Sequence, residues 1–96
     1  MIITNTYPGL EDLGNAYCYT GSIISADSID IRLGTKLLHV TGELKAETYI
    51  KAEGGIIAGG GISAGFNISA GEGISTGYSI SVGWNIIAGK GITAGW

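Results

Sequence analysis

An aliphatic residue recurs at every sixth position of this chain, and this spacing restricts the possible folds more than any other feature. From residue 62 to residue 92 the recurring residue is always isoleucine, and counting back in sixes gives Ile56, Ile50, Leu44 and Leu38. A second, mostly smaller residue follows two positions later, as Ala64 follows Ile62. Two side chains that are separated by one residue point the same way in a β-strand. The pattern therefore predicts a series of short strands, each with its alternate side chains buried.

The residues between these strands predict sharp corners. Glycine occupies the fourth position of the six-residue unit at residues 59, 65, 71, 77, 83, 89 and 95. So many glycines would each destabilise a helix by about 1 kcal/mol, and the apolar spacing is not helical. Glycine at a fixed place instead marks a point where the backbone bends sharply or adopts a positive φ. Strands this short need partners above and below, as in a coil that stacks on itself.

Residues 18 positions apart match one another in kind. Phe66 matches Trp84, Asn67 matches Asn85, and the opposite charges of Glu72 and Lys90 are brought together, whereas offsets of six or twelve give no such match. Three six-residue units per coil follow from this, so that each coil spans 18 positions. We therefore predict an all-β chain that folds as a single-stranded triangular β-helix (a β-solenoid).

The chain divides into two parts in this interpretation. Residues 38–96 are predicted to form the solenoid, and residues 1–37 an N-terminal cap with irregular first strands. Pro8, followed by the acidic residues Glu11 and Asp12, suits the first turn of a short helix in the cap. A cap is expected because an open coil exposes its apolar interior and its strand edges.

The repeated unit resembles known repeat classes. Each unit consists of an inward residue, any residue, a second inward residue, and then glycine or an acid. This pattern covers residues 38–96 and is similar to that of the hexapeptide-repeat β-helices. Here the larger inward residue comes first, the reverse of the usual order, so the handedness is left open. The segment from Leu38 to Ile62 is also similar to the repeats of bactofilin-type polymerising proteins. The "GISAG" tandem resembles short repeat proteins of phages and mobile elements.

Composition excludes several classes of function. The chain has 96 residues, room for one small domain, and a net charge of −3, which argues against binding of nucleic acid. Its single cysteine, Cys18, cannot form an internal disulfide, so nothing indicates an oxidising compartment. The segment "MIITNTYPGL" lacks the features of a signal peptide, and no apolar run reaches the length of a membrane span. We expect a cytoplasmic protein, in the host cytoplasm if a phage encodes it, with no membrane partner.

No residue pattern predicts catalysis, a cofactor or a metal site. His39 is the one histidine and is expected to point outward; hexapeptide-repeat acyltransferases use a histidine, but the partner motifs and additional coils of those enzymes are missing here. A zinc site of the carbonic-anhydrase kind needs several histidines. The glycine-rich run from Gly59 to Gly65 lacks the lysine and the helix of a phosphate loop. We therefore expect that the chain is not an enzyme, with acyltransferase activity at His39 as the least favoured hypothesis.

Aromatic side chains at the corners are the candidate binding residues. Phe66 and Trp84 should share one corner, and Tyr78 and Trp96 another, all facing outward. Stacked rings stabilise a ladder, but exposed tryptophan and tyrosine on a rigid scaffold are also typical anchors of protein interfaces. Asn67 and Asn85, beside the first pair, either form an amide ladder or contact a partner.

Two main hypotheses on function follow. The favoured one is a non-enzymatic protein that binds another protein through the aromatic corners, as a phage or mobile-element inhibitor of a host defence protein. The alternative is a self-assembling scaffold that polymerises by end-to-end stacking of coils. A homo-oligomer is expected in either case, through the edge of the last coil, which carries Ile92, Ala94 and Trp96. Short outward Ser and Thr columns make an ice-binding face a minor alternative.

Overall fold

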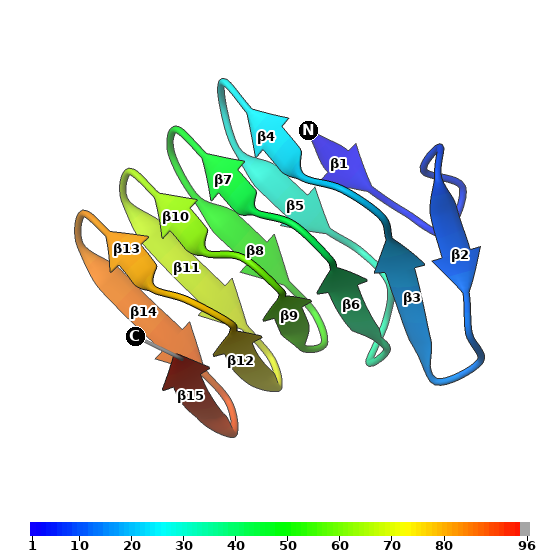
Figure 1. The fold of residues 1–96 in the computed structure, drawn as a ribbon. Coiled ribbons are helices and arrows are strands. Elements are labelled where there is room, and N and C mark those ends of the chain that lie inside the picture. The colour runs from blue at the N-terminus through cyan, green and yellow to red at the C-terminus, as the bar shows by residue number, and fades with distance from the viewer. Residues whose placement is uncertain (95–96) are drawn as a thin grey trace.

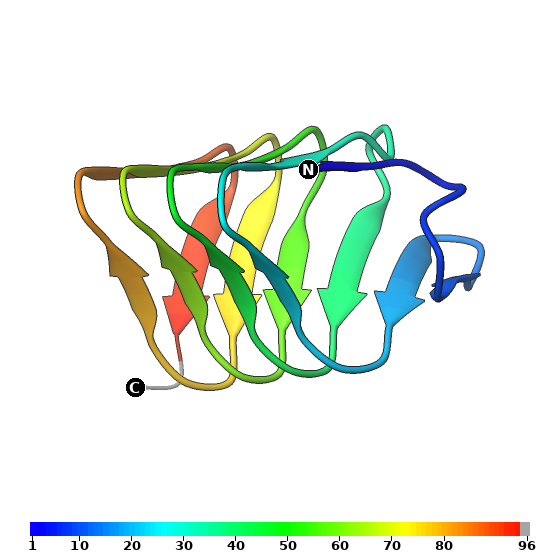
Figure 2. The ribbon, with the colours of Figure 1, turned by 90° about the horizontal axis from the view of Figure 1, so that it is seen from above.

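The protein is a three-sided β-solenoid in which each coil adds one strand to each of three sheets. The computed structural model describes residues 1–94, and these form 15 strands. Successive coils follow one another along a single axis, with β2 (Leu10–Asp12) and β15 (Gly91–Ala94) at opposite ends of the solenoid (Figure 1; Figure 2). The predicted all-β solenoid is confirmed. None of the described residues forms a helix long and apolar enough to cross a membrane.

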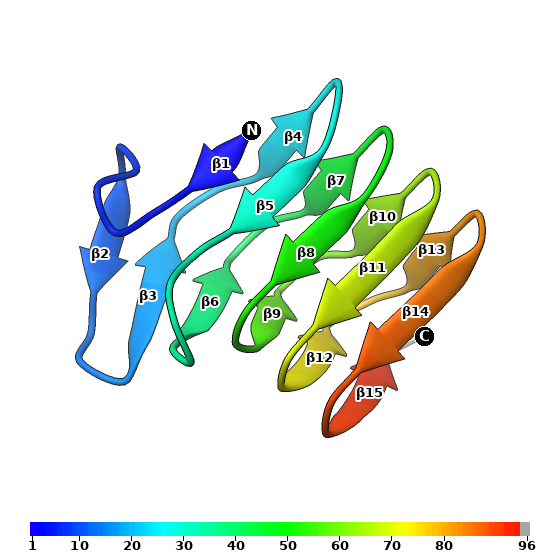
Figure 3. The same ribbon diagram turned by 180° about the vertical axis from the view of Figure 1, so that it is seen from behind.

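Each sheet forms one side of the triangle. Sheet A contains β1 (Ile2–Ile3), β5 (Ile29–Ile31), β8 (Ile50–Ala52), β11 (Asn67–Ala70) and β14 (Asn85–Ala88). Sheet B contains β2 (Leu10–Asp12), β3 (Ala16–Tyr19), β6 (Leu37–Val40), β9 (Ile56–Ala58), β12 (Gly73–Thr76) and β15 (Gly91–Ala94). Sheet C contains β4 (Ile23–Ser25), β7 (Leu44–Ala46), β10 (Ile62–Ala64) and β13 (Ile80–Val82). Figure 3 shows the strands of sheet A side by side in this order.

From Leu38 onward, paired residues on successive coils are 18 positions apart in the chain, as predicted. Ile62 pairs with Leu44 on one side and with Ile80 on the other, so equivalent residues lie directly above one another. Sheets A and B keep the same register, for example between Ile68 and Ile86. Parallel pairing of equivalent residues is what turns a repeat in sequence into columns of side chains in space.

The first coil, whose strands were predicted to be irregular, pairs in regular parallel register but is longer than the coils that follow. Ile23 pairs with Leu44 and Ile29 with Ile50, so the paired residues here are 21 positions apart and not 18. The additional residues lie in the loop 32–36, where Gly34 has a φ of +65°, a value that favours glycine. Strand pairing thus crosses residue 37 without a break, and the division into cap and solenoid at this residue stays a prediction.

The core consists of vertical columns of aliphatic side chains. Every strand from β4 to β12 has a large residue that is at most 2% exposed. In sheet C, for example, this column consists of Ile23, Leu44 and Ile62. A second column of small residues, such as Ala46 and Ala64, fills the remaining space. Burial of each isoleucine or leucine contributes about 1.5–3 kcal/mol, so these columns are the main source of stability.

The short helix expected near Pro8 is absent, and this prediction is wrong. Residues Leu10–Asp12 form β2, which pairs antiparallel with Tyr17–Tyr19 of β3. Gly9 and Gly14 on either side have φ values of +85° and +89°, which are turn conformations and not helical ones. The free edge of β3 offers hydrogen bonds that a short isolated helix does not, so tertiary pairing overrides the local preference.

Candidate functional site

The first predicted corner lies between sheet C and sheet A, where Phe66 and Trp84 follow β10 and β13. The backbone N–H of Phe66 donates to the carbonyl of Thr48 (2.7 Å), and the N–H of Trp84 donates to the carbonyl of Phe66 (2.9 Å). These bonds place the three residues in one column, each a coil above the last. We call Phe66, Trp84 and the adjacent Asn67 and Asn85 the aromatic corner.

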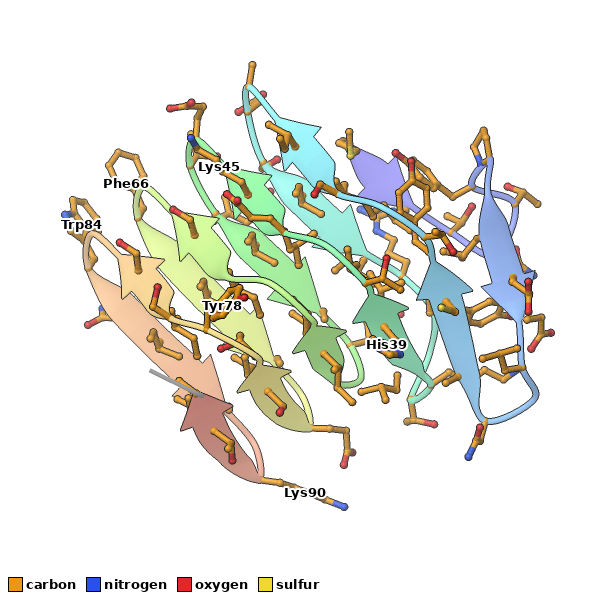
Figure 4. All side chains as sticks on the ribbon, in the orientation of Figure 1. His39, Lys45, Phe66, Tyr78, Trp84 and Lys90 are labelled. Carbon is orange, nitrogen blue, oxygen red and sulfur yellow. The ribbon has the colours of Figure 1, made fainter. Side chains whose placement is uncertain are left out.

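The two rings of the aromatic corner are stacked. Their centroids lie 4.7 Å apart with an interplanar angle of 27°. Phe66 remains 45% exposed and Trp84 70% exposed, so the stack shields only part of each ring (Figure 4). The predicted contact is confirmed. A stack of this kind stabilises the coil by about 0.5–1.5 kcal/mol and still presents a large apolar surface to solvent.

Glycine precedes each aromatic residue because adjacent coils come close together at this corner. The sequence predicted either a sharp bend or a positive φ at this position. A Cβ atom on Gly65 would collide with the carbonyl oxygen of Glu47, and one on Gly83 with the carbonyl oxygen of Gly65. Neither glycine has a positive φ. Glycine is therefore required here because one coil approaches the next closely. It is not required by a left-handed backbone conformation. The same approach carries the two aromatic side chains into contact.

Two polar oxygens lie buried at this corner without a hydrogen-bond partner. Within residues 1–94, the buried side-chain oxygens of this kind are Thr48 Oγ1 and Asn67 Oδ1. Thr48 lies directly beneath Phe66, and Asn67 follows Phe66 in the chain. Asn67 and Asn85 are in register, as predicted, but within the described residues Asn67 Oδ1 accepts no hydrogen bond from Asn85. An unpaired buried oxygen costs about 1–3 kcal/mol, so these two oxygens reduce the stability that the corner contributes.

The second predicted corner lies at the opposite edge of sheet C. Tyr78 stands there with 60% of its surface exposed, and its backbone N–H donates to the carbonyl of Gly60 (3.2 Å). Its predicted partner Trp96 lies outside the described residues. Since β13 runs from the Tyr78 corner to the Trp84 corner, the outer surface of sheet C is bordered by an aromatic side chain on each side (Figure 4).

The surface between the two corners is polar and slightly hollowed. A groove of about 240 Å³ lies beside Tyr78, and its lining includes Ser63, Ser81 and Glu43. Ser63 and Ser81 are in register on β10 and β13, with Lys45 before them on β7. We call this surface, with its two bordering corners, the sheet C face. Sequence reasoning did not identify it as one surface, because it did not order the corners around the triangle.

Two exposed side chains near this face were also missed. Tyr49 is 41% exposed and follows Thr48, so it lies one coil before Asn67 at the aromatic corner. Ile24 is 63% exposed on β4, in the outward column that continues to Lys45. Tyr49 is at the sixth position of its unit, where the equivalent residues of later coils are asparagine. The sequence pattern therefore gave no reason to expect an aromatic side chain at this position.

The third corner, between sheets A and B, carries the predicted ion pair. Lys90 Nζ lies 2.9 Å from Glu72 Oε1, and the lysine side chain is 75% exposed. A groove of about 460 Å³ runs beside this pair, over Gly73 and Gly91. An exposed pair of this kind contributes at most about 1 kcal/mol, so it supports the register of the coils. This groove is larger than the one beside Tyr78, but it lies away from the aromatic residues.

The remaining predicted residues lie on sheet B. His39 is half-buried on β6, where it points outward beside Cys18 of β3. Ile92 and Ala94 are on β15, the outermost strand of sheet B within the described residues, and Ile92 is 46% exposed. No group of three or more His, Cys, Asp or Glu side chains within residues 1–94 could hold a metal ion.

Comparison with known proteins adds no assignment. No protein-family model matches the chain, and neither a curated protein nor a solved structure matches it.

Proposed function

We propose that this protein is a non-enzymatic β-solenoid that binds another protein through the sheet C face, with the aromatic corner as its anchor. The observation that carries the proposal is the stack of Phe66 on Trp84, in which the indole is still 70% exposed. Tryptophan and tyrosine are enriched among the residues that dominate the energy of protein interfaces. A rigid stack loses little conformational entropy on binding, which favours affinity.

The charges on and near this face indicate what the partner surface offers. Exposed Glu43 and Glu47 lie on either side of Lys45, and the whole chain carries a net charge of −3. A partner with an apolar pocket for Trp84 and basic groups around it complements this arrangement. The resemblance of the "GISAG" tandem to phage and mobile-element proteins supports a more specific proposal, an inhibitor that occupies a surface of a host defence protein.

Capture of a partner from host-cell lysate on the immobilised chain tests this proposal. We expect Phe66→Ser with Trp84→Ser to reduce the captured protein at least tenfold. Ile87→Ser is the matched control, because Ile87 is 63% exposed but lies on sheet A, and it should leave capture unchanged. Both variants must keep the circular dichroism spectrum of the parent chain. Equal capture by the double variant would contradict the proposal.

End-to-end self-assembly is a second candidate, and one observation favours it. Ile92 is 46% exposed, whereas Ile74, below it in the same column, is 1% exposed. Within residues 1–94, strands β13, β14 and β15 each lie at one edge of their sheet. The coil of a second chain would cover both these strand edges and Ile92. Sedimentation over a range of concentrations tests this candidate. A chain that stays monomeric at high concentration contradicts it and leaves the first proposal intact.

A further inference from the structure

Three chemically reactive side chains lie in one row on the outer surface of sheet B. Glu11 of β2 pairs with Cys18 of β3, and Cys18 pairs with His39 of β6. The row continues with Ile57 of β9. His39 follows Cys18 by 21 positions, and neither the repeat nor any motif predicts that these residues are neighbours. The antiparallel return of β2 and the long first coil bring them together.

Cys18 and His39 point to the same side of the sheet. Their neighbours in the chain, Tyr17, Leu38 and Val40, are buried in the core, so alternation along each strand turns Cys18 and His39 outward. Both side chains are half-buried, which leaves each of them accessible from solvent. Figure 4 shows His39 on β6, on the side of the ribbon away from the core.

The spacing of the two strands suits an ion held between the side chains. Paired residues on adjacent strands lie about 4.8 Å apart. An ion bound in line between a cysteine sulfur and a histidine nitrogen needs these two atoms roughly 4 Å apart, if its bonds are about as long as those that the same ligands form with zinc. Cys18 and His39 are Cα partners on neighbouring strands, so this register places a thiolate and an imidazole side by side.

We propose that Cys18 and His39 form a two-ligand site for a soft monovalent metal ion of the Cu⁺ or Ag⁺ class. Thiolate selects soft ions, and no third ligand converges on this pair within residues 1–94, which disfavours a four-coordinate ion such as Zn²⁺. Binding releases the thiol proton of Cys18 to solvent, and the neutral imidazole of His39 supplies a lone pair. The oxidation state of the ion does not change.

The two neighbours in the row complete the site. The Glu11 carboxylate on one side adds negative charge, which favours a cation, and Ile57 on the other side is apolar and half-buried. The site is separate from the sheet C face, because it lies on sheet B. Binding of a metal ion and binding of a protein partner can therefore be tested independently.

Titration of the 96-residue chain with Ag⁺ in a chloride-free nitrate buffer tests the proposal. The chain has one cysteine and one histidine, so the outcome can be assigned directly. Isothermal titration calorimetry and native mass spectrometry should show one ion per chain. Cys18→Ser should abolish this binding, His39→Ala should weaken it at least tenfold, and the side-chain nitrogen resonances of His39 should shift on addition of Ag⁺.

Two further variants serve as controls. Ser75→Ala lies in the same row of sheet B but beyond Ile57, and it should bind Ag⁺ like the parent chain. Glu11→Gln should weaken binding only a few-fold, through loss of charge. The proposal would be overturned by unchanged affinity in His39→Ala or by unshifted imidazole resonances, because either result means that the thiol binds the ion without the histidine. It would also be overturned by one ion shared by two chains, because the two ligands would then not come from one Cys18–His39 pair.

Discussion

Gly71 lies so close to the carbonyl oxygen of Glu53, one coil below, that a Cβ atom on residue 71 would collide with it. Two residues later, a Cβ atom on Gly73 would meet only the carbonyl oxygen of Gly91, at an ordinary contact distance of 3.5 Å. Both glycines belong to the same corner of the same coil, and neither has a positive φ. Only the first of them is required for coils to stack.

Alanine substitutions at these two positions should therefore have different effects on stability. We expect Gly71→Ala to lower the free energy of unfolding by about 1–3 kcal/mol, since the coils must separate locally to admit the methyl group. Gly73→Ala should be neutral or stabilising by up to about 1 kcal/mol, because alanine restricts the unfolded chain. Urea denaturation followed by circular dichroism measures both. Equal destabilisation by the two variants would contradict a role for close approach.

The regular part of this fold could be predicted from the sequence because each coil repeats the last. A six-residue spacing of large residues such as Ile62 and Ile68 defines strands, and matches 18 positions apart define how they stack. Phe66 over Trp84 and Glu72 beside Lys90 both follow from this register. These contacts needed no knowledge of side-chain packing, only the fact that the backbone pairs in parallel.

The length of the first coil and the pairing of its side chains could not be predicted for two physical reasons. The loop 32–36 lengthens this coil, which interrupts the spacing before Leu38 although Ile23 and Ile29 are in the same columns. The strand β2 then runs antiparallel, so its register does not follow from the repeat. As a result the sequence pattern gave no sign that Cys18 and His39 are neighbours.

The narrow interior of the solenoid should not accept a larger side chain in its column of small residues. Ala64 is 4% exposed, with Ala46 and Val82 on either side of it. We expect Ala64→Leu to destabilise the protein by about 1–3 kcal/mol through overpacking. Ser63→Leu, one residue earlier on the outer surface, is the matched control and should change stability by less than about 0.5 kcal/mol. Thermal and urea denaturation of the two variants give the comparison.

Stability should depend on pH through Asp12. The backbone N–H of Gly14 donates to Asp12 Oδ1 (2.9 Å), Lys36 Nζ lies 3.4 Å from the same oxygen, and these contacts lower the pKa of the Asp12 carboxyl below its usual value. A lowered pKa in the folded state means that the carboxylate stabilises the protein above the usual pKa and ceases to do so as the pH falls through the lowered one.

Asp12→Asn isolates this contribution, because asparagine keeps the acceptor oxygen for Gly14 and loses only the charge. We expect the variant to unfold at a lower temperature than the parent chain at pH 6. The difference should shrink as the pH falls through the lowered pKa of Asp12, because the carboxyl of the parent chain then loses its charge. A difference that stays constant across a series of increasingly acidic buffers would show that the charge of Asp12 is not its cause.

The stack of Phe66 on Trp84 should contribute less to stability than to binding. In a double-mutant cycle with Phe66→Ser and Trp84→Ser, we expect a coupling energy of about 0.5–1.5 kcal/mol, the range for aromatic pairs. Phe66 is 45% exposed and Trp84 70% exposed, and the nearby Thr48 Oγ1 and Asn67 Oδ1 are unpaired, so solvation of these oxygens in the variants should offset part of the loss. Urea denaturation of the four proteins gives the coupling energy. A coupling energy well above this range, with partner capture unaffected, would mean that the rings serve only to hold the last coils together.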